Sequence, residues 1–388
     1  MVEPRSKIFI RLGLIIAIGL VALGMRLYFA NRHVIDQDEP TYLNAALRYT
    51  NYLRSGQYTW LAWDQENYQH PVLSKILYGI VLLTQDPLAE MHAKNFDTGM
   101  PIQSAEGKAW GLAARYTSAA LGTLASLAVA ALNPLAGLFF ATQSLNVIST
   151  SVVGLEALPL LTSFLAGVFY LSWLKRISRE APKKTASIWL GLSALALGMT
   201  AASKYTYCVV GLAIVLHFIL ESTSHPRLRK YYSHLAAWAG LTLIAFFIFD
   251  PYLWPHPVER LRKSLLFHAS YSQSSNVTEE KFPFWQPFFW LGSPYYRIYQ
   301  MYKHQLIFAP DRLIALLALV GLPGLWKRER FYFIWLVSGL VLLLAWPTKW
   351  PQYALIVMIP LCVSAAQGAL AIFSWGKTLA RRFMKKSA

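Results

Sequence analysis

Long apolar segments recur along the whole chain, and short polar or basic connections separate them. A helix that crosses the hydrocarbon core of a bilayer needs about 20 mostly apolar residues, with roughly 17 to 25 tolerated. Ten segments approach this length: 8–30, 110–131, 134–149, 152–174, 188–202, 206–220, 235–250, 306–326, 331–346 and 353–373. The pattern therefore predicts an all-α polytopic membrane protein with about ten transmembrane helices.

Two apolar segments have more than one interpretation. The stretch 188–220 could form one long helix, but Lys204 near its middle favours a hairpin that exposes this lysine. Residues 72–83 are too few to cross the bilayer. They predict a helix that lies at the membrane interface, with a re-entrant segment as the alternative.

Composition supports a membrane protein of one domain. Of the 388 residues, 55% are hydrophobic and only 14% are charged, and no stretch is polar for long enough to form a separate soluble domain. We therefore expect residues 1–388 to form a single transmembrane domain. Cys208 and Cys362 lie in apolar segments and indicate neither a disulfide framework nor a metal site.

The basic residues orient the predicted helices. The formal net charge of +17 is carried by short clusters between apolar segments, so we expect no nucleic-acid partner. The clusters lie at 5–11, 175–184, 225–230, 327–330 and 377–386. With ten spans, the positive-inside rule places both termini and all five clusters in the cytoplasm. Residues 31–108, with interfacial helices, and the aromatic-rich residues 251–305 then form two large external loops, on what we expect to be the extracytoplasmic face of the plasma membrane.

Three acidic residues follow the first predicted span directly. They are Asp36, Asp38 and Glu39, at the start of the first external loop. Ionisable groups at a membrane surface are costly, which makes them a functional hypothesis. The structural alternative is that one of them caps a helix that begins near Pro40, but a cap needs only one acid.

Four more charged residues are expected at the same face: Arg115, Glu156, Lys204 and Lys349. Arginine and lysine at the membrane boundary suit a phosphate, and the aromatic surroundings favour a lipid phosphate over a hydrated nucleotide. An adjacent carboxylate could take the proton of an acceptor hydroxyl as that hydroxyl attacks. The alternative is that Arg115 and Lys204 only extend toward the interface.

Other motifs give weaker signals. His70 could contact a substrate, although a single interfacial histidine is more often a hydrogen-bonded turn residue. His256 and His268 have no partner at a metal-ligand spacing, so no metal site is predicted. The sequence has no Gly-rich phosphate loop and no G-x-S-x-G motif, which disfavours nucleotide hydrolysis and serine-esterase chemistry.

Several of these residues lie in motifs that resemble those of a known family. Asp38-Glu39 resembles the acidic motif of GT-C glycosyltransferases, specifically the protein O-mannosyltransferase and aminoarabinose-transferase branch (family 39). The sequence HPVL at 70–73 resembles the family's HPPL motif. Three further stretches are similar to its later signatures: GLAARYTSAALGTL (111–124) with Arg115, GLSALALGMTAASKYT (191–206) with Lys204, and PTKWPQYALIVMIPL (347–361) with Tyr353. The resemblance covers most of the chain in the family's order.

The resemblance implies an inverting membrane enzyme of the GT-C fold. It would transfer a hexose or pentose from a polyprenyl-phosphate donor in the bilayer to a hydroxyl of an acceptor protein, lipid or glycan. Asp38 would be the general base, with Glu39 positioning it, and Arg115 and Lys204 would bind the donor phosphate. Further candidates for substrate binding are Asp36, His70, Glu156, Lys349 and Tyr353. No cofactor is required, and a divalent metal is compatible with this chemistry but not indicated by the residues.

The sequence departs from the family pattern at three places. Val72 replaces the second proline of HPPL, Glu156 stands where an aspartate is commoner, and no large soluble domain follows Phe373. The main alternative function is a secondary transporter or lipid flippase. Transporters tend to have charges near the bilayer midplane and two matching halves, whereas these charges gather at one face and no such symmetry is visible. A non-enzymatic scaffold is a weaker alternative.

Overall fold

The structure, a computed structural model, describes residues 5–64, 68–85, 105–179, 183–292 and 309–386. Over these residues all regular secondary structure is helical, as predicted. Five of the described helices are long and apolar enough to cross a membrane. The fold is therefore that of an all-α membrane protein, whereas the number of ten spans stays a prediction. The two large loops expected at 31–108 and 251–305 lie partly outside the described residues.

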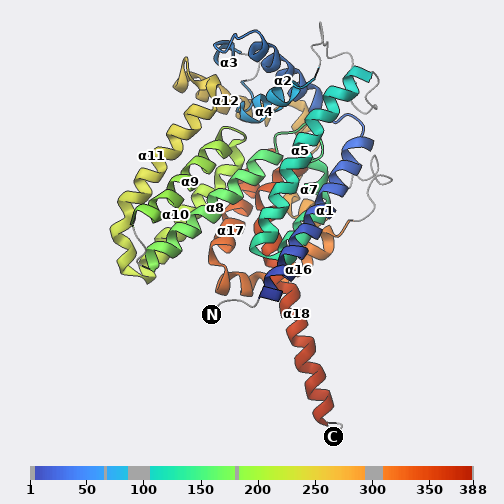
Figure 1. The fold of residues 1–388 in the computed structure, drawn as a ribbon, viewed down its shortest axis with the longest axis vertical. Coiled ribbons are helices and arrows are strands. Elements are labelled where there is room, and N and C mark those ends of the chain that lie inside the picture. The colour runs from blue at the N-terminus through green and yellow to red at the C-terminus, as the bar shows by residue number, and fades with distance from the viewer. Residues whose placement is uncertain (1–4, 65–67, 86–104, 180–182, 293–308, 387–388) are drawn as a thin grey trace.

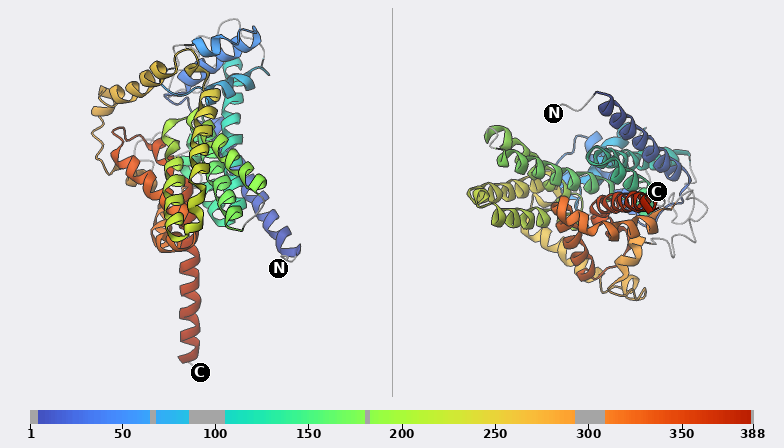
Figure 2. Two further views of the ribbon diagram at one scale, coloured as in Figure 1. Left: turned by 90° about the vertical axis from the view of Figure 1, so that its left-hand side faces the viewer. Right: turned by 90° about the horizontal axis from the view of Figure 1, so that it is seen from below.

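Nine of the described helices form an elongated bundle. They are α1 (Arg5–Arg32), α5 (Ala105–Leu132), α8 (Ala157–Ser178), α9 (Lys183–Ala201), α10 (Val209–Ser224), α11 (Tyr232–Phe249), α16 (Asp311–Arg328), α17 (Arg330–Ala345) and α18 (Met358–Lys386). Helix α5 packs on α1 and α8, α9 packs on α8 and α11, and α18 packs on α16. Both termini lie at one end of the bundle, and α18 projects beyond that end (Figures 1 and 2).

Short helices gather at the opposite end (Figure 1). We call five of them the cover: α2 (Glu39–Arg54), α3 (Trp60–Trp63), α4 (Leu73–Leu82), η4 (Pro251–Leu253) and α12 (Pro257–Tyr271). Helix α4 is the apolar segment expected at the membrane interface, and it packs along α2. Arg260 of α12 donates hydrogen bonds to the carbonyl oxygens of Ala62 and Tyr252. This arginine ties α12 to α3 and η4.

Two predicted spans differ in detail from the structure. Segment 134–149 forms two helices, α6 (Pro134–Thr142) and α7 (Ser144–Ser149), which are separated at Gln143. A break inside a bundle exposes backbone groups that need partners, and the Asp311 carboxylate accepts a hydrogen bond from the Ser144 N–H at 3.1 Å. Segment 188–220 forms α9 and α10, joined through η2 (Tyr205–Cys208). The expectation that this turn exposes Lys204 is wrong, because Lys204 is only 6% exposed.

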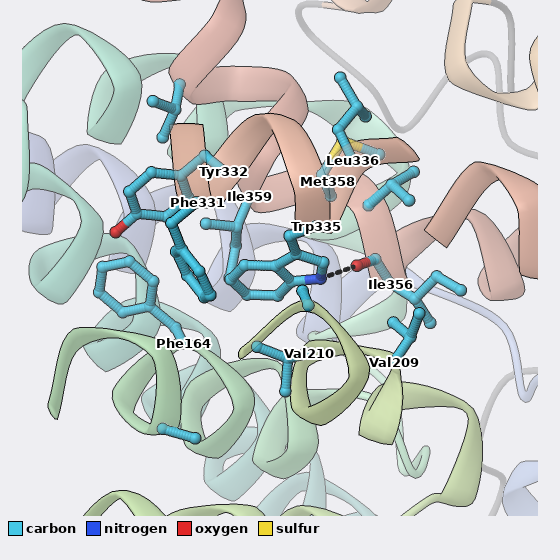
Figure 3. Close-up of a cluster of buried hydrophobic side chains, with 14 of the residues drawn as sticks. Phe164, Val209, Val210, Phe331, Tyr332, Trp335, Leu336, Ile356, Met358 and Ile359 are labelled. Atoms are coloured by element: carbon cyan, nitrogen blue, oxygen red, sulfur yellow. Dashed lines mark hydrogen bonds between the residues drawn. The ribbon is translucent and has the colours of Figure 1, made fainter. Parts of the chain in front are cut away.

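The largest hydrophobic core lies between the bundle helices, and Figure 3 shows part of it. Trp335 of α17 is buried there, and its indole Nε1 donates to the Ile356 carbonyl at 3.0 Å. Ile356 belongs to η5 (Pro351–Val357), which leads into α18. This packing holds η5, and with it Tyr353, against the rest of the bundle. The remaining short helices are η3 (Pro226–Tyr231), α13 (Ser275–Thr278) and α14 (Gln286–Gly292).

Candidate active site

The candidate site lies where the cover meets the bundle. Asp36 and Asp38 lie in the turn between α1 and α2, and Glu39 is the first residue of α2. Glu156 directly precedes α8, and Lys204 lies between α9 and η2. Four of these five residues stand at the beginning or end of a helix, where the polypeptide leaves the apolar bundle.

All the N–H groups of the Arg115 side chain, in α5, donate hydrogen bonds within the protein. Its Nε donates to Glu39 Oε1 at 2.8 Å and its Nη2 to Glu39 Oε2 at 2.5 Å. The remaining hydrogens go to the carbonyl oxygens of Ala30, His33 and Val34, at 2.8, 2.8 and 3.2 Å. A guanidinium has five N–H donors, so this geometry leaves none for a donor phosphate. Arg115 instead holds the turn that carries Asp38.

The Glu39 carboxylate, like the Arg115 guanidinium, makes several hydrogen bonds within the protein. Besides Arg115, its carboxylate accepts hydrogen bonds from the backbone N–H groups of Val153 at 2.7 Å and Asp36 at 2.9 Å. Burial alone would raise the pKa of Glu39, but the hydrogen bonds and charge of Arg115 outweigh it, and the pKa lies below its ordinary value. A buried carboxylate with four hydrogen bonds and a lowered pKa is suited to positioning rather than to accepting a proton.

Lys204 forms a second buried ion pair, with Glu156. The other oxygen of Glu156 accepts a hydrogen bond from the Tyr207 hydroxyl at 2.6 Å. The Lys204 ammonium also lies 5.1 Å from the centre of the Tyr353 ring. An ammonium carries three hydrogens, so the contact with Glu156 leaves Lys204 able to donate to a further group.

Asp38 differs from the other acids because the residue is exposed and its side chain makes no cap with α2. Partial desolvation by the surrounding protein raises the pKa of Asp38. The charge of Lys204 opposes that rise, and the charge of Glu156 adds to it. Asp38 therefore lies within the electrostatic reach of the second ion pair. Asp36 is partly buried, accepts a hydrogen bond from the Asp38 N–H at 3.1 Å, and has a pKa raised to about 6 by desolvation and then by Asp38.

A pocket of about 150 Å³ adjoins Lys204. Its wall consists mainly of aromatic and apolar side chains: His70, Lys204, Tyr205, Thr206, Leu265, His268, Leu342, Trp346 and Tyr353. An apolar pocket with a few converging polar groups is the usual form of a small-molecule site. The pocket joins residues of the cover to residues of the bundle.

Two histidines lie next to each other on the cover side of this pocket, with their ring planes tilted by 50°. The ring centres of His70 and His268 are 4.9 Å apart. Burial and the charge of Lys204 lower the pKa of both imidazoles, that of His268 to about 4. Both rings are therefore neutral at neutral pH, and each can donate one hydrogen bond and accept another.

Apart from Asp36 and Asp38, the predicted residues divide into three groups. His70, Lys204 and Tyr353 line the pocket, and Glu156 supports Lys204. Glu39 and Arg115 form a separate ion pair that does not line it. Lys349 lies elsewhere: its ammonium donates to the carbonyl oxygens of Leu343 and Leu344 at 2.7 and 2.9 Å. It caps the end of α17 and does not line the pocket, which argues against a role in substrate binding.

Sequence reasoning missed several pocket residues. The sequence pattern points to His268 only as a possible metal ligand, and it gives Tyr205 and Trp346 no role. Tyr205 directly follows Lys204 in the chain, which is a signal that could have been used. His268 could not be placed, because its contact with His70 joins segments nearly 200 residues apart. Among the described residues, no three His, Cys, Asp or Glu side chains lie close enough together to hold a metal ion.

Comparison with known proteins supports the fold. No protein-family model matches the chain, and no curated protein matches its sequence. The apo crystal structure of the Archaeoglobus fulgidus oligosaccharyltransferase is similar, with a TM-score of 0.56 and 11% identity over 99% of this chain and 53% of that one. A structure of the A. fulgidus oligosaccharyltransferase AglB with an inhibitory peptide and a dolichol-phosphate gives a TM-score of 0.50 and 10% identity, over 99% and 52% of the two chains.

The chain thus spans about half the length of these archaeal enzymes. At such low identity, the likeness concerns the arrangement of helices and leaves the reaction to be argued from the site. Together with the helical bundle and its apolar helices, it shows that this membrane chain has the GT-C glycosyltransferase fold.

Proposed function

We propose that this protein is a membrane glycosyltransferase that moves a sugar from a polyprenyl-phosphate donor to an acceptor hydroxyl. The observation that carries the proposal concerns Asp38: the residue is exposed, its side chain makes no capping bond with α2, and its pKa responds to the charges of Lys204 and Glu156. Lys204 in turn lines the pocket. The fold supports it, since one similar archaeal enzyme was solved with a dolichol-phosphate. The acceptor hydroxyl belongs to a protein, a lipid or a glycan.

Asp38 acts as the general base. The acceptor oxygen forms a bond to the anomeric carbon of the sugar while the bond from that carbon to the phosphate oxygen breaks. The hydroxyl proton goes to the Asp38 carboxylate, and the electron pair of the broken bond goes to the departing lipid phosphate. The raised pKa of Asp38 makes it a stronger base than an ordinary aspartate.

Lys204 stabilises the departing phosphate. It lines the pocket, is buried, and is held in place by Glu156, so its charge is fixed before the reaction begins. A preorganised charge in a site of low polarity is often the largest single contribution to catalysis. Tyr207 keeps Glu156 in position through its hydroxyl.

Arg115 and Glu39 position Asp38 rather than touching the substrate. Their paired hydrogen bonds fix the turn from Ala30 to Glu39 against α5. The neutral imidazoles of His70 and His268 can exchange hydrogen bonds with sugar hydroxyls in the pocket. This division of roles replaces the expectation that Arg115 binds the donor phosphate.

The proposal is tested by release of free polyprenyl phosphate. The purified protein in lipid nanodiscs is given a series of polyprenyl-phosphate sugars with hydroxyl acceptors, and the released lipid is measured by mass spectrometry. Lys204→Met should lower the rate by roughly 10²- to 10³-fold, the usual effect of removing one preorganised group that stabilises developing charge. Lys263→Met is the control, because Lys263 is an exposed lysine of α12 that does not line the pocket. Equal rates for the two variants would contradict the role of Lys204.

A further inference from the structure

A short buried segment joins the two ion pairs of the candidate site. Residues 150–156 connect α7 to α8 and form no helix of their own. All of them except Gly154 are buried. Backbone that is buried outside helices needs hydrogen-bond partners from elsewhere in the chain. Helices α2 and α4 supply two of those partners here.

The segment contacts both ion pairs directly. Its Val153 N–H donates a hydrogen bond to Glu39 Oε1 at 2.7 Å, and its last residue, Glu156, pairs with Lys204. Val153 and Glu156 are so close in the chain that at most about 10 Å of extended backbone separates them. Glu39 directly follows Asp38, the proposed base. The conformation of the segment therefore sets where Asp38 lies relative to Lys204.

Tyr78 of α4 holds the segment from the side of the cover. Its side chain is 2% exposed, and its hydroxyl donates to the Gly154 carbonyl at 2.5 Å. A phenol has a single O–H hydrogen, so the Ser118 hydroxyl of α5, at 2.6 Å, donates to Tyr78 in turn. Tyr78, Val153 and Leu155 belong to the same small hydrophobic core. The Tyr78 hydroxyl thus fixes the backbone between the residues that contact the two ion pairs.

Arg26 of α1 holds the beginning of the segment. This arginine is fully buried, and its Nε donates to Thr150 Oγ1 at 2.8 Å. The Thr150 hydroxyl in turn donates to the Asn146 carbonyl at 2.6 Å. A methyl group added at Gly122 of α5 would lie 2.6 Å from both Arg26 Nε and Thr150 Oγ1, so α5 packs closely on this contact. Because α1 leads into the turn that carries Asp38, the contact joins that turn to the segment a second time.

We propose that residues 150–156 couple the two ion pairs and so fix the general base relative to the cation that binds the departing phosphate, with Tyr78 and Thr150 as positioning residues. Neither of the two lines the pocket, and each acts through its hydroxyl on the segment. A misplacement of about 1 Å in a reacting group can lower a rate roughly 100-fold. The inference rests on the proposed function for its effect on the rate, whereas its effect on the segment is independent of that function.

The first test compares Tyr78→Phe with Tyr170→Phe. Tyr78→Phe removes the hydroxyl and keeps the packed ring, so kcat should fall about tenfold or more while the KM for the donor changes by less than about threefold. Tyr170 is the matched control: it is also buried, and its hydroxyl bonds to His217 Nδ1 at 2.9 Å, about four helical turns after Glu156 in α8. Tyr170→Phe should lose similar thermal stability and keep its kcat. An equal fall of kcat in both variants, or a donor KM that changes more than kcat, would overturn the proposal.

The second test uses two substitutions of Thr150. Thr150→Val keeps the shape of the side chain but removes the acceptor of the Arg26 N–H, and it should lower kcat in the same way as Tyr78→Phe. Thr150→Ser keeps the hydroxyl, and its kcat should stay within about threefold of the parent value. Equal losses of kcat in Thr150→Val and Thr150→Ser would show that only the packing of Thr150 matters and would contradict its role as a positioning residue.

Hydrogen exchange gives a readout that needs no activity. In Tyr78→Phe the amides of residues 150–156 should exchange faster than in the parent, whereas Tyr170→Phe should leave them as protected as in the parent. Unchanged protection of this segment in Tyr78→Phe would overturn the proposal. If the parent protein transfers no sugar, the proposed function fails, and the exchange measurement still decides whether Tyr78 holds the segment that joins the two ion pairs.

Discussion

At the scale of single residues, the charged side chains at the candidate site form two buried ion pairs, Glu39 with Arg115 and Glu156 with Lys204. The charged residues at the helix ends could be found because such groups are rare beside apolar segments. The role of Arg115 could not be found in the same way, because its partner Glu39 lies 76 residues away in the sequence. Only the folded chain shows that all five N–H donors of Arg115 are used. His268 is a pocket residue for a similar reason: its importance comes from contact with His70 and not from its local sequence.

The buried pair of Glu39 and Arg115 gives a prediction at this scale. Arg115→Met leaves the Glu39 carboxylate buried without its counter-charge and should lower the free energy of unfolding by about 3–5 kcal/mol. Removing both charges in Glu39→Met/Arg115→Met should restore much of that stability. Equilibrium unfolding in detergent measures the free energy of unfolding of the single and the double variant. Arg330→Met is the control: it breaks a more exposed pair with Glu221 and should cost about 1 kcal/mol or less. A similar loss in Arg330→Met and Arg115→Met would contradict this account of Arg115.

At the scale of elements, the lengths of apolar segments located the helices, because a bilayer fixes how many apolar residues a helix needs. The breaks within those segments were harder to foresee. Gln143 interrupts a continuous apolar segment, and this is tolerated because Asp311 of a distant helix supplies a partner. The turn at Lys204 was expected, but its burial depends on Glu156, which no local pattern reveals.

The contact between α16 and α18 gives a prediction at the scale of elements. A methyl group added at Gly321 would lie 1.8 Å from the Ser364 carbonyl oxygen, and one at Gly368 would lie 1.9 Å from that of Leu317. Because both obstacles are backbone, Gly321→Ala or Gly368→Ala should force the helices apart and destabilise the protein by roughly 1–3 kcal/mol. Gly376→Ala is the control in the same helix, since nothing lies within 4 Å of its added methyl. Thermal unfolding should show a lower midpoint for Gly321→Ala and Gly368→Ala than for Gly376→Ala. Equal unfolding midpoints for the three variants would contradict the close packing of α16 and α18.

At the scale of the whole molecule, the cover lies at one end of the bundle and both termini lie at the other (Figure 1). The fold pairs charged residues from distant parts of the chain, Glu39 with Arg115 and Glu156 with Lys204, where the cover meets the bundle. From the positive-inside rule, the sequence predicted that these charged residues lie at the same end of the bundle. It could not predict the pocket, whose wall depends on how α12 lies over η2 and α17.

The orientation in the membrane is itself testable. We expect the cover to face the extracytoplasmic side and the end of α18 the cytoplasm. With Cys208 and Cys362 replaced by serine, Tyr58→Cys should react with a membrane-impermeant maleimide in intact cells, because Tyr58 is exposed on the cover. Met384→Cys, exposed near the end of α18, should react only after permeabilisation. The reverse pattern would place the site in the cytoplasm.

The measurement that tests the account most directly is the pH dependence of sugar transfer in the parent and in Asp38→Asn. The parent rate should fall as the pH drops through the pKa of Asp38, at a pH above the ordinary aspartate value of about 4, because a general base must be ionised and this pKa is raised. Asp38→Asn should be inactive at every pH while keeping the thermal stability of the parent, since the Asp38 side chain makes no capping bond in the fold. Substantial transfer by Asp38→Asn with an unchanged pH profile would contradict the assignment of Asp38 as the base.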